Sequence, residues 1–163
     1  MPHTACLSLG SNVDPERHLA AAVKALRAEF GELRFSAFYR TRAVGFDGPD
    51  FVNAAAVLRT TLDVHALDAW LHALEDAHGR DRSGPRYGNR NIDIDIVLFD
   101  DLVIDGPGRL RLPRADLRHA FVLRPLAEIA PDIVEPVSGR TLAALWDDSS
   151  ERGLAMEPVV LPA

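Results

Sequence analysis

Two patterns of apolar residues alternate along the chain and predict an alternation of strands and helices. Residues 4–9 and 51–60 form apolar runs of strand length, bounded by Gly, Asn or Asp. Asp14 and Asp63 are each expected to cap a helix, because after each of them apolar residues recur every three or four positions, as on the buried face of a helix. We expect the first helix to end at Gly31 and the second near His78.

The remaining patterns complete the expected element order. Residues 33–40 and 92–99 read as strands, 121–129 and 141–146 as short helices, 103–112 as a small hairpin and 159–161 as a last strand. The order β-α-β-β-α-β predicts a ferredoxin-like α+β fold: an antiparallel sheet with helices mainly on one face, followed by C-terminal additions. The chain has 163 residues and no repeats, so we expect one domain over 1–163.

Composition narrows the function and the compartment. The net charge of −6 argues against a general nucleic-acid or membrane-surface binder. Cys6 is the sole cysteine, which excludes an internal disulfide and fits a reducing cytosol, and it lies in an apolar run typical of core. No apolar run reaches membrane-spanning length. We therefore expect a cytoplasmic protein and, because no interface signature is visible, a monomer.

The most informative segment is the strand 92–96, in which isoleucine and aspartate alternate. Side chains on a strand alternate between its two faces, so Asp93 and Asp95 point the same way, about 7 Å apart. Two neighbouring carboxylates repel each other unless a cation lies between them. Mg²⁺ favours such oxygen ligands, combined with substrate phosphates and water.

An arginine-rich loop precedes this strand. Arg80, Arg82, Arg86 and Arg90 form a local positive cluster, offset only by Asp81. Guanidinium groups suit phosphate oxygens, so the loop and the strand together predict metal-assisted phosphoryl chemistry. An ordinary amphipathic strand with a charged edge is the alternative, but aspartate is depleted in strands and the arginine cluster would remain unexplained. We expect ATP with Mg²⁺ to order residues 81–91.

Known nucleotide-binding motifs are missing from the sequence: it has no P-loop, no dinucleotide glycine fingerprint and no protein-kinase signature. The six histidines show no zinc-ligand spacing, and His65, His72 and His78 read as plain surface residues.

Several short motifs together resemble the 6-hydroxymethyl-7,8-dihydropterin pyrophosphokinase family over essentially the whole chain. They are Leu9-Gly10-Ser11-Asn12, Phe38-Tyr39-Arg40-Thr41, Pro49-Asp50-Phe51-Val52-Asn53-Ala54-Ala55, Glu75, Gly79-Arg80, Arg90-x-x-Asp93-x-Asp95-Ile96, Leu112-Pro113 and Phe121-Val122-Leu123-x-Pro125-Leu126. The resemblance implies a ferredoxin-like fold and Mg-dependent transfer of pyrophosphate from ATP to the pterin hydroxymethyl group, which releases AMP in folate biosynthesis.

The resemblance also implies roles for individual residues. Asp93 and Asp95 would hold two Mg²⁺ ions, and Arg80 and Arg90 would contact phosphate as catalytic residues. The implied ATP contacts are Glu75, Arg82, Arg86, Tyr87, Ile96 and Arg109. The implied pterin contacts are Gly10, Thr41, Ala43, Val44, Phe51, Asn53 and Phe121, with the two phenylalanine rings stacking on the pterin and Asn53 reading its edge. The expected partners are these two small molecules, with neither nucleic acid nor membrane.

Departures from the family pattern fall near the expected ATP site. Tyr87 replaces a common tryptophan, Asn89 stands where proline or a small residue is usual, and Arg114, Ala115 and His119 lie in a segment about one residue shorter. These departures leave open a catalytically weak paralogue that binds pterin or nucleotide as a regulatory module. A nucleotidyl cyclase on the same fold is a further alternative, which the pterin-type residues on the strand 51–60 disfavour.

Overall fold

The computed structural model describes residues 2–31, 33–41, 50–78, 91–106, 108 and 110–161. The strands are β1 (His3–Ser11), β2 (Arg34–Phe35), β3 (Phe38–Thr41), β4 (Phe51–Thr60), β5 (Asp93–Phe99) and β6 (Glu157–Val159). The helices are α1 (Pro15–Phe30), α2 (Val64–Ala77), α3 (Ala120–Ile129) and α4 (Leu142–Asp147), with a short 3₁₀ turn η1 (Ala115–Arg118) before α3. The expected element order is confirmed.

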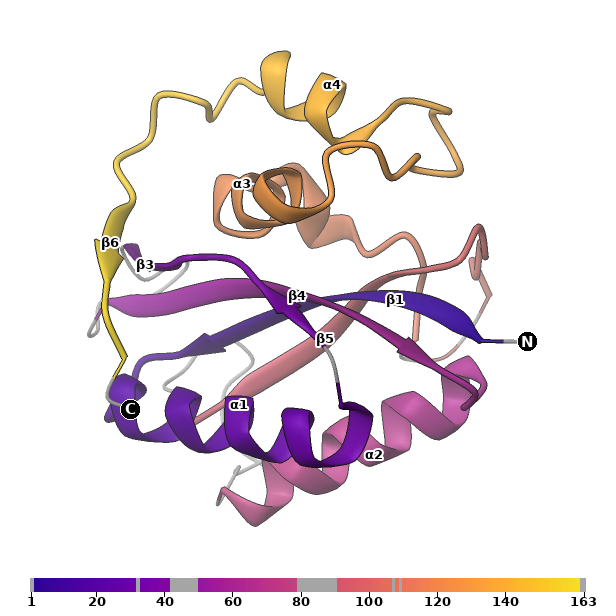
Figure 1. Cartoon of the computed structure of the whole chain (residues 1–163). Coiled ribbons are helices and arrows are strands. Elements are labelled where there is room, and N and C mark those ends of the chain that lie inside the picture. Colours follow the sequence, from indigo (N-terminus) through magenta and orange to yellow (C-terminus); the bar gives the residue numbers. More distant parts are fainter. Residues whose placement is uncertain are drawn as a thin grey trace.

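The strands form one antiparallel sheet with helices on both faces. Its order is β5-β1-β4-β3-β6, with β2 also paired to β4, so β1 and β4 are interior strands and β5 is an edge. The helices α1 and α2 cover one face, and α3 covers the other with α4 beyond it (Figure 1). The two long helices share a face, as the ferredoxin-like pattern requires, and the C-terminal helices are the predicted additions.

Each face of the sheet has its own apolar core because strand side chains alternate. Leu7, Leu9 and Ile94 belong to the core under α1 and α2, whereas Cys6 and Ala55 belong to the core under α3. Burial raises the pKa of the Cys6 thiol to about 12, so it stays neutral, as expected of a core residue.

Two strand predictions need correction. The expected strand 33–40 is broken into β2 and β3, because Ser36 turns its hydroxyl inward to accept from the Ala55 N–H at 2.9 Å. The next residue, Ala37, donates its N–H to the Glu128 carboxylate of α3 at 2.8 Å and so leaves the ladder. The expected hairpin at 103–112 is reduced to a single bridge between Ile104 and Leu112.

The two helix starts behave differently. Asp63 caps α2 as predicted, because its Oδ1 accepts from the Ala66 N–H at 2.8 Å. The predicted cap at Asp14 is wrong: the residue has φ 47° and makes no side-chain cap. Its carboxylate instead accepts from Arg17 Nε at 2.5 Å. In the described parts of the chain, none of the helices is long and apolar enough to cross a membrane.

Candidate active site

Several of the predicted site residues lie beside Gly10, near the end of the interior strand β1. Gly10 is paired with Asn53 on β4 and with Asp93 on β5, and Ser8 is paired with Ala55 and Asp95. Opposite residues of an antiparallel pair point to the same face of the sheet. The carboxylates and the amide therefore share the face that α3 covers, on strands about 10 Å apart.

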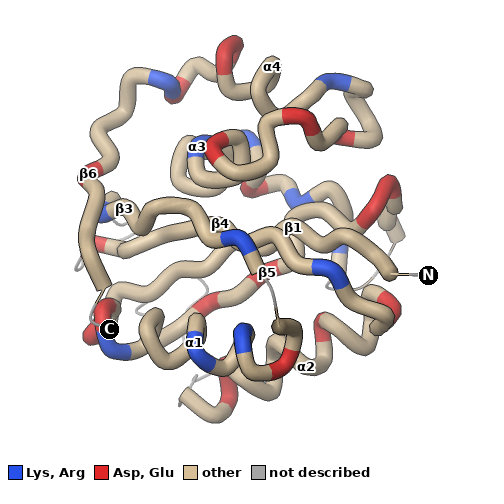
Figure 2. The backbone as a smooth tube through the Cα atoms, viewed as in Figure 1, with Lys and Arg blue, Asp and Glu red and all other residues tan. Residues whose placement is uncertain are grey.

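The two aspartates occupy the exposed side of an edge strand. Asp93 and Asp95 are half-buried, while Ile94 and Ile96, which alternate with them, are buried on the opposite face. This alternation confirms the predicted placement of the carboxylates. The adjacent interior strand β1 contains no Asp, Glu, Lys or Arg, so the two aspartates of β5 lie beside an uncharged strand (Figure 2).

The two carboxylates suit an open magnesium site, in which substrate and water supply the other ligands, better than a site whose ligands all come from the protein. In the part of the chain that the structure describes, no group of three or more His, Cys, Asp or Glu side chains is arranged so that it could hold a metal ion by itself. Two accessible carboxylates are what Mg²⁺ uses when phosphates and water complete its octahedral shell. The residues present therefore fit the implied metal.

A buried glutamate supports the acidic strand from below. Glu75 of α2 is 1% exposed, and its Oε2 accepts from the Ile94 N–H at 2.8 Å. The Ile94 amide lies between Asp93 and Asp95 along the strand, so this bond holds the edge strand at the position between the two carboxylates. The sequence implied an ATP contact for Glu75, which stays a prediction, and missed this role. The signal was its spacing of four from Leu71 and eight from Leu67, on the apolar stripe of the helix.

The amide half of the site is buried and sterically tight. Asn53 is 6% exposed, and its Nδ2 donates to the Thr41 hydroxyl at 2.8 Å. A Cβ atom at Gly10 would lie 2.7 Å from Asn53 Oδ1 and 3.8 Å from Phe51 Cδ1. Only glycine leaves this amide in place, and the predicted pterin-contacting residues Gly10, Thr41, Phe51 and Asn53 are thus adjacent.

Phe121 lies in the first turn of α3 and is partly exposed. Its ring stacks on His119, with centroids 5.3 Å apart and an interplanar angle of 11°. The His119 ring lies 3.1 Å from the Glu151 carboxylate, which also accepts from the Ala120 N–H at 2.9 Å. That backbone hydrogen bond lowers the pKa of Glu151 below its usual range. One of the sequence departures therefore supports the ring predicted to stack on pterin.

Eight predicted site residues lie outside the described residues. They are Ala43, Val44, Arg80, Arg82, Arg86, Tyr87, Arg90 and Arg109. The arginine loop and its ordering by ATP consequently stay predictions. Ile96, an implied ATP contact, is 2% exposed and packs in the core under α1 and α2.

Two of the histidines first read as surface residues have structural contacts. His78, at the end of α2, lies 2.9 Å from the buried His18 of α1, Nδ1 to Nδ1, and its carbonyl accepts from Asn91 Nδ2 at 2.6 Å. His72 lies 3.5 Å from Asp68, and its side chain is 19% exposed. The surface interpretation is correct only for His65, which is exposed.

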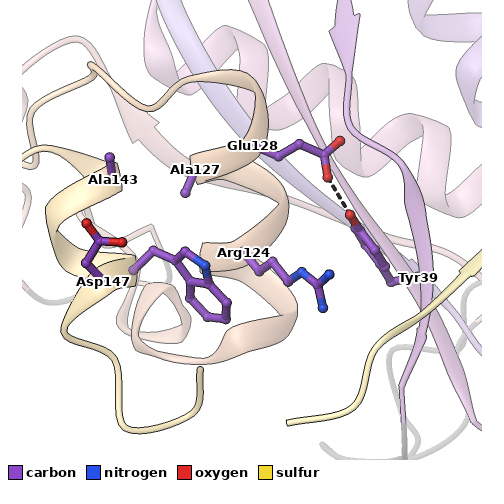
Figure 3. A pocket seen from close by; sticks show the side chains of 7 residues that line it. Tyr39, Arg124, Ala127, Glu128, Ala143 and Asp147 are labelled. Atoms are coloured by element: carbon purple, nitrogen blue, oxygen red, sulfur yellow. Dashed lines mark hydrogen bonds between the residues drawn. The ribbon is translucent and has the colours of Figure 1, made fainter. Parts of the chain in front are cut away.

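A cavity of about 290 Å³ lies beside the site, between β3, α3 and α4 (Figure 3). It is lined by Tyr39, Arg124, Ala127, Glu128, Ala143, Trp146 and Asp147, which do not include any predicted site residue. The Tyr39 hydroxyl donates to Glu128 at 2.5 Å, as the dashed line in Figure 3 marks, and the Arg124 guanidinium lies over the Tyr39 ring. These contacts tie α3 to β3 and make the cavity part of the scaffold.

The antiparallel α+β fold and the pair of carboxylates on β5 are compatible with a metal-dependent phosphoryl-transfer enzyme. The model of the 7,8-dihydro-6-hydroxymethylpterin-pyrophosphokinase family matches residues 6–131, and the chain belongs to this family.

Named relatives agree with this assignment. A 2-amino-4-hydroxy-6-hydroxymethyldihydropteridine pyrophosphokinase of Synechocystis sp. is 38% identical over 147 residues, covering 88% of this chain and 74% of the relative. The protein of the same name from Haemophilus influenzae is 39% identical over 140 residues, covering 83% and 86%. The crystal structure of Plasmodium falciparum HPPK-DHPS shares the fold, with a TM-score of 0.75 and 14% identity, over 93% of this chain and 45% of the other.

Proposed function

We propose that the residues around Gly10 carry out the reaction of the family. The chain is an ATP-dependent pyrophosphokinase of folate biosynthesis, which transfers pyrophosphate from ATP to the hydroxymethyl group of 6-hydroxymethyl-7,8-dihydropterin. The observation that carries the site assignment is the register of three strands, which sets Asn53, Gly10 and Asp93 side by side on one face.

On this proposal, the carboxylates of Asp93 and Asp95 would hold the two Mg²⁺ ions that the family uses with ATP. When bound, the ions would neutralise phosphate charge and make the pterin hydroxyl easier to ionise. The hydroxymethyl oxygen then bonds to the β-phosphorus of ATP, the bond from that phosphorus to the α-phosphate oxygen breaks, and AMP leaves. Arg80 and Arg90 are proposed to stabilise the charge that grows on the leaving phosphate, with Arg82, Arg86, Tyr87 and Arg109 around the nucleotide.

The pterin is proposed to bind on the other side of Gly10. Asn53, oriented by Thr41, would read the hydrogen-bonding edge of the ring together with the backbone at 43–44. Phe51 and Phe121 would stack on its two faces. This arrangement directs the hydroxymethyl group toward the carboxylates, about two strand spacings away.

Among the described residues, the proposed metal ligands and pterin contacts come from β1, β3, β4, β5 and α3 of a single copy of the chain, which supports a monomeric enzyme. The buried, neutral Cys6 is compatible with the proposed cytoplasmic location.

The proposal is tested by following AMP formation from ATP with and without the hydroxymethyl pterin. We expect AMP only when pterin and Mg²⁺ are both present, with the pyrophosphorylated pterin in equal amount by mass spectrometry. A protein that binds pterin tightly but forms no AMP would instead be the regulatory module considered above. AMP formed without pterin would exclude the pterin as the acceptor.

A further inference from the structure

Arg114 brings a positive charge to the proposed metal site from outside the arginine loop. Its backbone N–H donates to the Val97 carbonyl at 3.0 Å, which anchors the residue to β5 two positions beyond Asp95. Its Nη2 lies 3.6 Å from Asp95 Oδ2, and its Nε lies 3.4 Å from Asp116 Oδ2. The guanidinium is therefore held between two carboxylates, one of which is a proposed metal ligand.

The distances from this guanidinium to the two carboxylates are longer than those of charge-assisted hydrogen bonds. Charge-assisted hydrogen bonds from arginine to carboxylate are about 2.7–2.9 Å long, well below both distances here. The Nε atom is buried and has no hydrogen bond of acceptable geometry within the described residues. A buried donor without an acceptor is unfavourable. The guanidinium would therefore gain hydrogen bonds from an anion that fits its geometry better than these two carboxylates.

We propose that Arg114 is the counter-cation of the metal site. With no metal bound, it neutralises Asp95; when metal and triphosphate enter, the guanidinium turns from Asp95 to a phosphate oxygen. The inference rests on the proposed function, because it requires Asp95 to be a metal ligand. Its consequence is that a divalent ion alone is repelled by Arg114, whereas ion and nucleotide together are not.

This role predicts effects of opposite sign for the two ligands. Arg114→Gln should bind Mn²⁺ alone about tenfold more tightly, because one unit charge a few ångströms from a dication is removed at a half-exposed site. The same variant should bind a nonhydrolysable ATP analogue with Mn²⁺ about tenfold more weakly, because a phosphate contact is lost. A purely structural arginine would weaken both ligands together.

Three further variants complete the test. Arg59→Gln removes the same charge from an exposed position of β4 opposite Thr4, six residues along β1 from Gly10 and so about 20 Å away. Asp116→Asn removes the competing carboxylate, so Arg114 should hold Asp95 more strongly and Mn²⁺ alone should bind more weakly. Arg114→Lys retains the charge, so its Mn²⁺ affinity should stay within threefold of the original chain.

Mn²⁺ binding is measured by electron paramagnetic resonance of the free ion, and analogue binding by calorimetry, on variants whose circular dichroism is unchanged. Tighter Mn²⁺ with weaker analogue in Arg114→Gln, and neither change in Arg59→Gln, supports the inference. Unchanged or weaker Mn²⁺ binding in Arg114→Gln overturns it. Should that variant not fold, Asp116→Asn decides: unchanged or tighter Mn²⁺ binding overturns the inference.

The same measurements on one more variant, Asp95→Asn, separate a failure of the proposed metal site from a failure of the role of Arg114. Asp95→Asn should lose Mn²⁺ binding both with and without the analogue. If Asp95→Asn binds Mn²⁺ like the original chain, the proposed metal site itself is wrong. If Asp95→Asn loses the ion but Arg114→Gln does not gain affinity, the metal site stands and only the role of Arg114 fails.

Discussion

The strands on the two sides of Gly10 differ in exposure and charge. On one side, β5 is an edge strand whose carboxylates stay half-exposed. One of them, that of Asp95, lies at ion-pair distance from Arg114. On the other, β4 is an interior strand whose Asn53 is buried, neutral and fixed by a hydrogen bond of 2.8 Å to Thr41. On the proposed function, the acidic side depends on metal ions that bind and leave with the nucleotide, whereas the amide side depends on a fixed arrangement of packed side chains.

This contrast separates chemistry from stability. Carboxylates that repel each other on an accessible edge add little to the free energy of unfolding, so their removal should affect the reaction alone. A buried amide against a glycine is part of the packing, so changes there should affect both. The predictions below test whether the two sides can be disturbed independently.

The largest effect is expected on the acidic side. Asp95→Asn or Asp93→Asn should lower the rate of AMP formation by about 10³-fold, because each removes a charged metal ligand. The melting temperature should stay the same or rise slightly, since mutual repulsion is relieved. Steady-state kinetics and thermal unfolding measure the two quantities.

Asp101→Asn is the matched control, because Asp101 is an exposed aspartate in the turn that follows β5. It should change neither quantity. Near-normal activity of Asp95→Asn at saturating Mg²⁺ would contradict the two-metal assignment.

On the amide side, Gly10→Ala should affect both stability and binding. The new Cβ would meet Asn53 Oδ1 at 2.7 Å, so the amide or the strand must shift. We expect a loss of about 1–3 kcal/mol in the free energy of unfolding and a rise of about 30-fold in the KM for pterin, since a small misplacement near the substrate is costly. Gly153→Ala, where nothing lies within 4 Å of the added atom, should be neutral. A Gly10→Ala enzyme with unchanged pterin KM would remove Asn53 from the pterin site.

Phe121→Ala should weaken the binding of pterin much more than the binding of ATP. Loss of one stacked ring should raise the pterin dissociation constant about tenfold and leave that of ATP within twofold. Equal weakening of both ligands would indicate a general packing defect, because Phe121 also packs against the core under α3. In a complex with pterin, we expect the Phe51 and Phe121 rings to lie roughly parallel and about 7 Å apart.

The sequence predicted most of the sheet because its strands carry local signals. The apolar runs of β1 and β4 and the alternation of β5 are set by neighbours in sequence, and so is the cap at Asp63. The break at Ser36 was missed because it depends on Ala55 and Glu128, far away in the sequence. Propensity reports local preference, and such long-range hydrogen bonds override it.

The same limit applies to the site. The carboxylates and the amide could be predicted because motif spacing marks them, but their meeting at Gly10 is a matter of register. The helical spacing of Glu75 places it on the buried face of α2 but does not identify Ile94 as its partner, and no periodicity in the chain encodes the contact of Arg114 with β5. Arg114 appeared in the sequence only as a departure from a pattern.

Glu75→Gln tests whether the acidic strand needs its buried support. Glutamine keeps an oxygen for the Ile94 N–H but loses the charge, so we expect a loss of about 1–2 kcal/mol in the free energy of unfolding and a rate within about fivefold of the original. Glu75→Leu removes the acceptor as well and should lower both the free energy of unfolding and the rate further. Urea unfolding and AMP kinetics measure these effects. Equal stability of the two variants would show that the hydrogen bond to β5 contributes nothing.

The smallest effect is expected at the support of Phe121 and depends on pH. The Ala120 N–H lowers the pKa of Glu151 in the folded state, so its stabilising contribution is present above the usual carboxyl pKa of about 4.3 and is lost as the pH falls through the lower folded value. Glu151→Gln should therefore reduce the free energy of unfolding by about 0.5–1 kcal/mol at pH 7. At a pH below the lowered pKa of Glu151 the two proteins should converge, because the carboxylate of the original chain is then protonated. Urea unfolding at both pH values measures the gap. A gap of equal size at both would show that the negative charge does not cause it, because glutamine also keeps an acceptor oxygen, and the charge of Glu151 would then have no part in holding α3 and Phe121 in place.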